Sequence, residues 1–297
     1  MAFPFLMPAW VLFGCGAAIL SAVLMLLQER LRVDGYALAI WCKIACVCVT
    51  LPFVLINGLP TQPLFYLFLG IGAVLWSISD VVFFRGIPQA GAGAVSRVLP
   101  SSILISFLLW FVIDPDLLHT YLGQPWVFAG IAVVMALWAF CASNLRKCPV
   151  SMGALRAVWF VLFAASIGPL LAKLTTQNAA IEQGPYAYVF VEGLMMITLL
   201  GTYGLIRRPI AAGVFFAPST MRGGLLIGAV MAAAVLLSLY AYYAADNPAY
   251  VPAVKLLDAV IILAVYAAIG RRNNGDIWSG LGVVGCAALL IALKSFV

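Results

Sequence analysis

The chain has 297 residues, of which 65% are hydrophobic and only 9% are charged, and its mean hydropathy is +1.13. Soluble domains carry about 25% charged residues, so this composition excludes a soluble globular protein and indicates an integral membrane protein. Long apolar runs, without alternating ten-residue strands, favour a helix bundle over a barrel. The formal net charge of +6 lies mostly in short connections, which is typical of a topology signal and not of a nucleic-acid surface.

Runs of about 20 apolar residues predict ten transmembrane helices. The first run lacks the positively charged segment of a signal peptide, so we expect it to remain as the first helix. The predicted helices lie near residues 8–28, 36–57, 62–84, 90–113, 125–143, 151–173, 185–206, 221–244, 248–269 and 277–296. Short connections rich in Gly, Pro and Asn join them, so a ligand site is expected inside the bundle.

Basic residues in the connections predict an orientation. Lys or Arg follows predicted helices one, three, five, seven and nine, whereas the connections after helices two, four and eight have none and the sixth has only Lys173 at its border. The positive-inside rule places the first set in the cytoplasm and both termini outside. We therefore expect an integral protein of a bacterial cytoplasmic membrane with outward termini.

The two halves of the chain, residues 1–147 and 148–297, show related patterns. Trp126 and Trp278 each lie four residues before a glycine in a helix of small residues. Because each half has five predicted helices, an odd number, the halves must be inserted in opposite senses. The sequence thus predicts an all-α membrane domain of ten transmembrane helices in two inverted five-helix repeats, with the substrate near the midplane between them.

The ends of the two halves, GQPWVFAGIAVVMAL and GDIWSGLGVVGCAALL, together with Pro100 in the fourth predicted helix, carry a family resemblance. The chain resembles the drug/metabolite transporter (DMT) superfamily, and in particular its EamA-like members. This resemblance implies a ten-helix transporter. The chain departs from the family pattern in lacking the Gly-Glu pair before the last helix of each half and in having Asp258 where the second half would have its proline. The family usually keeps its termini in the cytoplasm.

Arg97 and Lys255 occupy similar places in the fourth predicted helix of each half. An ionisable group at the centre of a membrane helix costs about 2.5 to 3.5 kcal/mol on insertion scales and indicates a functional site. A guanidinium and an ammonium there suit a carboxylate or a phosphate, and the family resemblance implies an anion-binding role for these two positions. The alternative is that Asp258 neutralises Lys255 one turn away and that Arg97 snorkels to an interface.

Lys43 and Glu192 fall within one position of each other in the second predicted helices of the two halves, where similar transporters line their cavity. A poorly solvated carboxylate favours its protonated form, so Glu192, with Asp258 as a further candidate, could carry a proton. The alternative for Glu192 is a static ion pair with Lys43, Arg97 or Lys255. Tyr240, in a tyrosine-rich run, is the candidate for hydrogen bonding to a ligand.

The sequence does not indicate an enzyme. Its one histidine, His119, is expected in a loop between predicted helices four and five, and the known metalloprotease, intramembrane aspartate and phosphate-loop patterns are absent. Seven cysteines without paired spacing suggest neither disulfides nor a metal site. We expect no cofactor, no metal and no nucleic acid, but a lipid bilayer and a small-molecule substrate as partners.

These observations predict a secondary transporter that moves a small anionic or zwitterionic metabolite, such as an organophosphate, an organic acid or an amino acid, by alternating access. Coupling would be by exchange or proton movement. The candidate residues include three basic and two acidic groups, a formal sum of +1 that favours such a substrate. Two alternatives remain, a flippase for a polar or phosphate-bearing lipid and a non-transporting membrane subunit.

Overall fold

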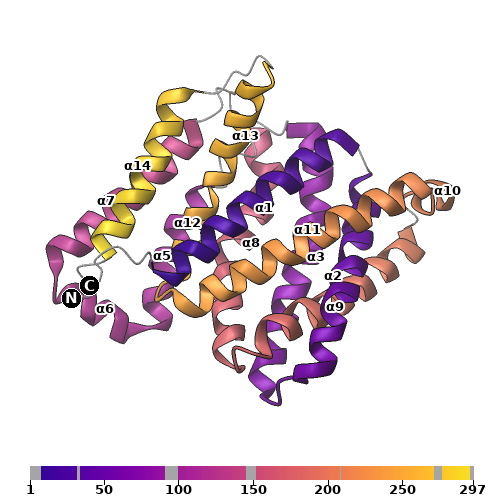
Figure 1. Ribbon diagram of the computed structural model, residues 1–297, viewed down its shortest axis with the longest axis horizontal. Helices are drawn as coiled ribbons and strands as arrows, with labels where there is room; N and C mark the ends of the chain where they lie inside the picture. Colours follow the sequence, from indigo (N-terminus) through magenta and orange to yellow (C-terminus); the bar gives the residue numbers. More distant parts are fainter. Residues whose placement is uncertain are drawn as a thin grey trace.

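The computed structural model describes residues 8–31, 34–90, 100–144, 152–207, 209–270 and 276–294, with side chains at all of these except 80–90, 152–158, 263 and 277. The regular elements in these ranges are helices (Figure 1). They are α1 (Ala9–Leu31), α2 (Gly35–Asn57), α3 (Pro63–Ala90), α5 (Ser101–Ile113), α6 (Pro115–Leu122), α7 (Pro125–Asn144), α8 (Met152–Gln177), α9 (Gly184–Arg207), α10 (Ala212–Phe215), α11 (Pro218–Ala244), α12 (Tyr250–Lys255), α13 (Leu257–Ala268) and α14 (Ile277–Lys294).

Every predicted helical segment overlaps a helix of the structure, but three details differ. The fourth segment, predicted at 90–113, is described as a helix only from Ser101. The sixth continues to Gln177, so Lys173 lies inside α8 and not at its border. The ninth is divided at Leu256 into α12 and α13.

The prediction of a loop around His119 is wrong, because these residues form α6. Pro115 occupies the first turn, where its missing N–H costs no hydrogen bond. The Asp114 side chain accepts a hydrogen bond from the backbone N–H of Leu117 at 3.0 Å. These two signals begin a helix of only eight residues, which is too short for a hydropathy window to detect.

Seven helical segments in the described part of the chain are long and apolar enough to cross a membrane, with α12 and α13 counted together as one, Tyr250–Ala268. The count is eight if α5 and α6, which are bent by 104° to each other, form one broken span. The apolar stretches Pro63–Ser79 in α3 and Trp278–Lys294 in α14 are shorter. The structure is therefore an all-helical membrane protein with seven to eight candidate spans among the described residues, and the ten-span arrangement stays a prediction.

The main helix contacts join elements far apart in the sequence. α1 packs along α11, α3 along α8, α2 along both α9 and α11, and α7 along α14 (Figure 1). Glycines allow close approach at several crossings: a Cβ on Gly228 of α11 would lie 2.6 Å from the Cα of Cys42 in α2. Small residues at such crossings let membrane helices approach backbone to backbone.

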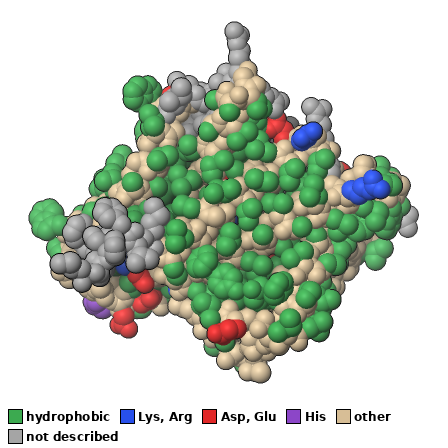
Figure 2. Space-filling view, viewed as in Figure 1, with side chains coloured by type: hydrophobic (Ala, Val, Ile, Leu, Met, Phe, Trp, Pro, Cys, Tyr) green, Lys and Arg blue, Asp and Glu red, His purple; other side chains and the backbone are tan. Residues whose placement is uncertain are grey.

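The outward surface of the bundle is largely apolar. Side chains such as Leu55, Ile56 and Leu205 are at least 75% exposed, which suits contact with lipid chains. Hydrophobic side chains spread over the broad face in Figure 2, whereas charged groups lie near its edges, with basic and acidic ones at the upper right and further acidic ones along the lower edge.

Candidate functional site: a buried ion pair between α2 and α9

The helices α2 and α9 lie antiparallel, as contacts at both ends show. At the start of α2, the Tyr36 hydroxyl donates a hydrogen bond to the carbonyl of Leu200 at 2.5 Å. At its end, the Gln183 amide, just before α9, donates to the carbonyl of Asn57 at 2.8 Å. The start of α2 thus contacts the later part of α9, and the end of α2 contacts the residue just before α9. These two contacts fix the register between the helices.

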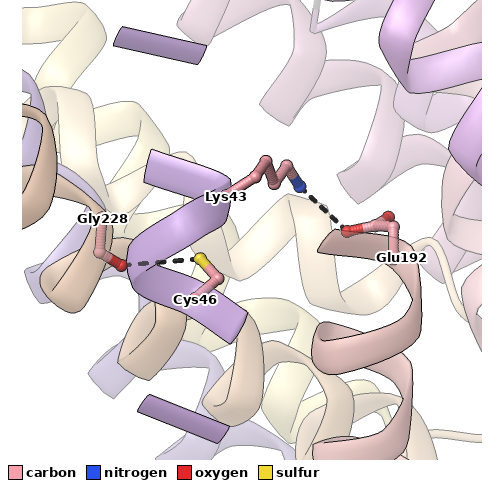
Figure 3. Close-up of polar contacts among 4 residues, drawn as sticks. All are labelled: Lys43, Cys46, Glu192 and Gly228. Atoms are coloured by element: carbon pink, nitrogen blue, oxygen red, sulfur yellow. Dashed lines mark hydrogen bonds and ion pairs between the residues drawn. The ribbon is translucent and has the colours of Figure 1, made fainter. Parts of the chain in front are cut away.

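Lys43 and Glu192 form an ion pair between these two helices. The Lys43 Nζ lies 2.9 Å from the Glu192 Oε2, and both side chains are only 7% exposed (Figure 3). Each residue is the ninth of its helix, so at a rise of 1.5 Å per residue both lie roughly 12 Å from the helix start. The pair therefore occupies the central part of the helices, away from their ends.

Small and weakly polar groups surround the ion pair. Gly193, next to Glu192, faces α2 so closely that a Cβ there would lie 2.7 Å from the Val47 Cγ2. On the other side of α2, the Cys46 thiol donates to the Gly228 carbonyl at 3.5 Å (Figure 3). Tyr188, one turn before Glu192, is buried and interacts with its carboxylate. Each charge of the pair is thus poorly solvated and depends on its partner.

Lys255 and Asp258 lie on other elements than the ion pair. Lys255 ends α12 and Asp258 stands in the first turn of α13, on either side of Leu256. Both side chains are half-buried. They interact electrostatically, but no ion pair within bonding distance joins them. The neutralisation of Lys255 by Asp258 therefore stays a prediction.

Arg97 lies outside the described residues, and Tyr240 takes no part in the ion pair. Tyr240 of α11 is half-buried, with its ring 5.5 Å from that of Phe13 in α1 and 6.5 Å from that of Tyr186 in α9. Tyr186 lies at the beginning of α9, whereas Glu192 lies two turns further. The structure brings together Lys43 and Glu192 among the predicted site residues.

Lys173 is a buried basic residue that the sequence did not single out. Its ammonium, in α8, donates hydrogen bonds of 2.7 Å to the carbonyls of Tyr242 and Ala245 at the end of α11. A cation there satisfies carbonyls that have no partner within the helix and opposes the helix dipole. The sequence could have identified this residue as a lysine inside a helical run. It did not, because the predicted helix ended at residue 173 whereas the helix continues to Gln177.

The junction between α11 and α12 is closed by polar contacts with α5, α6 and α14, the last of these an ion pair of Lys294 with Asp246. The Asn247 side chain, fully buried, donates to the carbonyl of Phe107 at 3.3 Å and accepts from the N–H of Ala249 at 2.9 Å. The hydroxyls of Tyr121 and Tyr250 are 2.5 Å apart. Elements from both halves of the chain are therefore joined at this end of the bundle.

Comparisons with known proteins show the fold and not the family. No protein-family model matches the chain, and no curated protein matches it. A solved structure titled "Crystal structure of protein" superimposes with a TM-score of 0.67 at 13% sequence identity, covering 97% of this chain and 96% of that one. The chain therefore shares its whole-length fold with a protein of known structure whose title states no function.

Proposed function

We propose that this chain is an EamA-like transporter of the DMT superfamily that moves a small anionic or zwitterionic metabolite by alternating access. The observation that carries the proposal is the buried Lys43–Glu192 ion pair in the middle of two antiparallel, membrane-length helices. Charged residues at such depth are expensive and typically mark a substrate or proton pathway. No enzymatic step is part of the proposal.

The pattern of helix contacts supports two inverted repeats. A two-fold operation between residues 1–147 and 148–297 would relate α1 to α8, α2 to α9, α3 to α11 and α7 to α14. The observed pairs α1 with α11 and α3 with α8 exchange under that operation, and the pairs α2 with α9 and α7 with α14 map onto themselves. Repeats related in this way place the substrate site at their interface near the midplane, where Lys43 meets Glu192.

In this proposal Lys43 provides a cation for the anionic group of the substrate, and Glu192 accepts a substrate cation or a proton. Arg97, Lys255 and Tyr240 remain candidate substrate-binding residues, and Asp258 remains a candidate for proton coupling. The closed junction at Asn247 and the Tyr121–Tyr250 contact fit a state in which one end of the bundle is shut. Alternating access then requires those contacts to open.

Counterflow in proteoliposomes tests the proposal. Phosphate esters, dicarboxylates and amino acids would be offered in parallel to the wild type and to a Lys43→Met, Glu192→Met variant that removes both charges. We expect at least one class to exchange in the wild type and to lose exchange at least tenfold in the variant. Glu182→Gln and Arg207→Gln, at exposed positions, serve as controls that retain exchange.

The other outcomes distinguish the alternatives. Movement of a fluorescent polar lipid between leaflets, without metabolite exchange, would support a flippase. If the protein always co-purifies with a second chain and shows neither metabolite exchange nor lipid movement, the result would support a non-transporting subunit. Equal exchange in the wild type and in the double variant would refute the role of the ion pair.

A further inference from the structure

Any ligand that separates Lys43 from Glu192 has to compensate two buried charges. Both side chains are 7% exposed and their charged atoms are 2.9 Å apart, so each now neutralises the other. Leaving one member of such a pair without a partner lowers the equilibrium constant for ligand binding roughly 150- to 4,000-fold. An anion that bound Lys43 alone would incur this loss at Glu192.

The side chains can separate without the helices separating. The Tyr36–Leu200 and Gln183–Asn57 hydrogen bonds hold α2 to α9 on either side of the ion pair, and the rings of Phe53 and Tyr186 stack at 4.6 Å. These contacts join the two helices independently of the ion pair, so a ligand that bound its members would not have to part the helices.

We propose that the substrate, together with any proton that is carried with it, has no net charge at this site. It is either a zwitterion, whose carboxylate binds Lys43 and whose ammonium binds Glu192, or a monoanion that binds Lys43 while one proton neutralises Glu192. This inference rests on the proposed transport function and deepens it, because it fixes the net charge that accompanies each substrate.

The groups around Glu192 leave Lys43 as its compensating charge among the described side chains. From α2 the Cys46 thiol is directed at the Gly228 carbonyl, and Tyr188 of α9 itself is buried one turn before Glu192. From α11, Tyr242 is buried in the same hydrophobic cluster as Tyr188. The ammonium of Lys173 in α8 is directed at the carbonyls that end α11, and α3 presents Gly72 to the Tyr188 hydroxyl.

Transport under an imposed membrane potential tests the charge balance. The purified protein would be placed in proteoliposomes with valinomycin and a potassium gradient, with radiolabelled alanine as the zwitterionic probe and lactate as the monoanionic probe. We expect the rate for an accepted probe to change less than twofold when the potential is reversed. Lactate uptake should acidify the lumen, as reported by pyranine, and alanine uptake should not.

Glu192→Gln gives the decisive variant, since its amide needs no proton. The rate of lactate uptake by this variant should change at least tenfold when the potential is reversed, and this uptake should no longer acidify the lumen. The rate of alanine uptake should fall at least tenfold. Glu182→Gln, at an exposed position, should behave as the wild type. If Glu192→Gln does not fold, the wild-type measurements of potential and lumen pH decide alone.

The outcomes separate this inference from the proposed function. A wild-type uptake rate that changes with the potential, or lactate uptake without acidification of the lumen, would refute the proposed neutral charge balance. Either result would still be consistent with a transporter. Absence of both uptake and counterflow for all probes would overturn the transporter itself and this inference with it.

Discussion

The ion pair shows how much one buried charge depends on another. The Lys43 ammonium and the Glu192 carboxylate compensate each other, so their removal one at a time and together should have unequal effects. Lys43→Met alone leaves a carboxylate at membrane depth and should lower the free energy of unfolding by about 3–5 kcal/mol. Lys43→Met with Glu192→Met should cost much less. Thermal unfolding in detergent measures both, and equal losses would contradict a directly coupled pair.

Among single residues, the sequence was sufficient to single out Lys43 and Glu192 as ionisable residues inside apolar runs but not to show that they pair with each other. Lys43 and Glu192 are detectable because each is an ionisable residue inside an apolar run at a related position of its half. Their contact was one of several alternatives, since Glu192 could have faced Arg97 or Lys255. Periodicity carries no information about which helices are neighbours, and 149 residues separate the partners.

Contacts between helices depend on glycine where two backbones approach. Gly228→Ala would place a Cβ 2.6 Å from the Cα and the carbonyl oxygen of Cys42, and backbone atoms cannot move as a flexible side chain can. We expect a loss of about 1–3 kcal/mol in the free energy of unfolding. Gly201→Ala, where a Cβ meets nothing within 4 Å, is the matched control and should be neutral or stabilising. A similar loss in both would contradict the packing explanation.

The end of α11 depends on the buried cation of α8. Lys173→Met would remove the donor to the carbonyls of Tyr242 and Ala245, which should cost about 1–3 kcal/mol because the carbonyls lose their partner. Amide hydrogen exchange should accelerate selectively at residues 245–250. Arg207→Met, at an exposed position, should leave this exchange unchanged. Uniform acceleration across the bundle would instead indicate general destabilisation.

Long helices were predictable and short ones were not. Hydropathy over about 20 residues detects a span because the bilayer requires that length. α6 depends instead on a local interaction, the Asp114 cap that begins it. α10 has a long-range contact, because the carbonyl of Phe215 at its end accepts a hydrogen bond at 3.0 Å from the indole of Trp41, 174 residues away in the sequence. A hydropathy window over this run likewise does not detect the division at Leu256.

For the whole molecule, the distribution of charge predicts which connections share a side of the membrane. A cysteine introduced at Gly213, in the arginine-flanked connection that contains α10, should be labelled only after permeabilisation. A cysteine at Glu182, between α8 and α9, should be labelled from outside. Both variants would be made in a background without native cysteines. The reverse labelling pattern would place the termini in the cytoplasm.

The pairing of helices in the whole bundle was not predictable from single helices. The predicted five helices per half imply opposite insertion, which stays a prediction, and the pairing of α1 with α11 and of α3 with α8 follows from tertiary contacts that no single helix encodes. Sequence similarity is also uninformative at this level, since a shared whole-length fold persists at 13% identity.

The long separation of the ion pair has a consequence for how the protein is made. Lys43 enters the membrane 149 residues before Glu192 is synthesised, an interval of about 7 to 30 s at ordinary rates of translation. Throughout that time the nascent chain lacks the Glu192 carboxylate that pairs with Lys43. The contact between α2 and α9 thus forms only when α9 arrives, and membrane chaperones and proteases have that interval in which to recognise an incomplete chain.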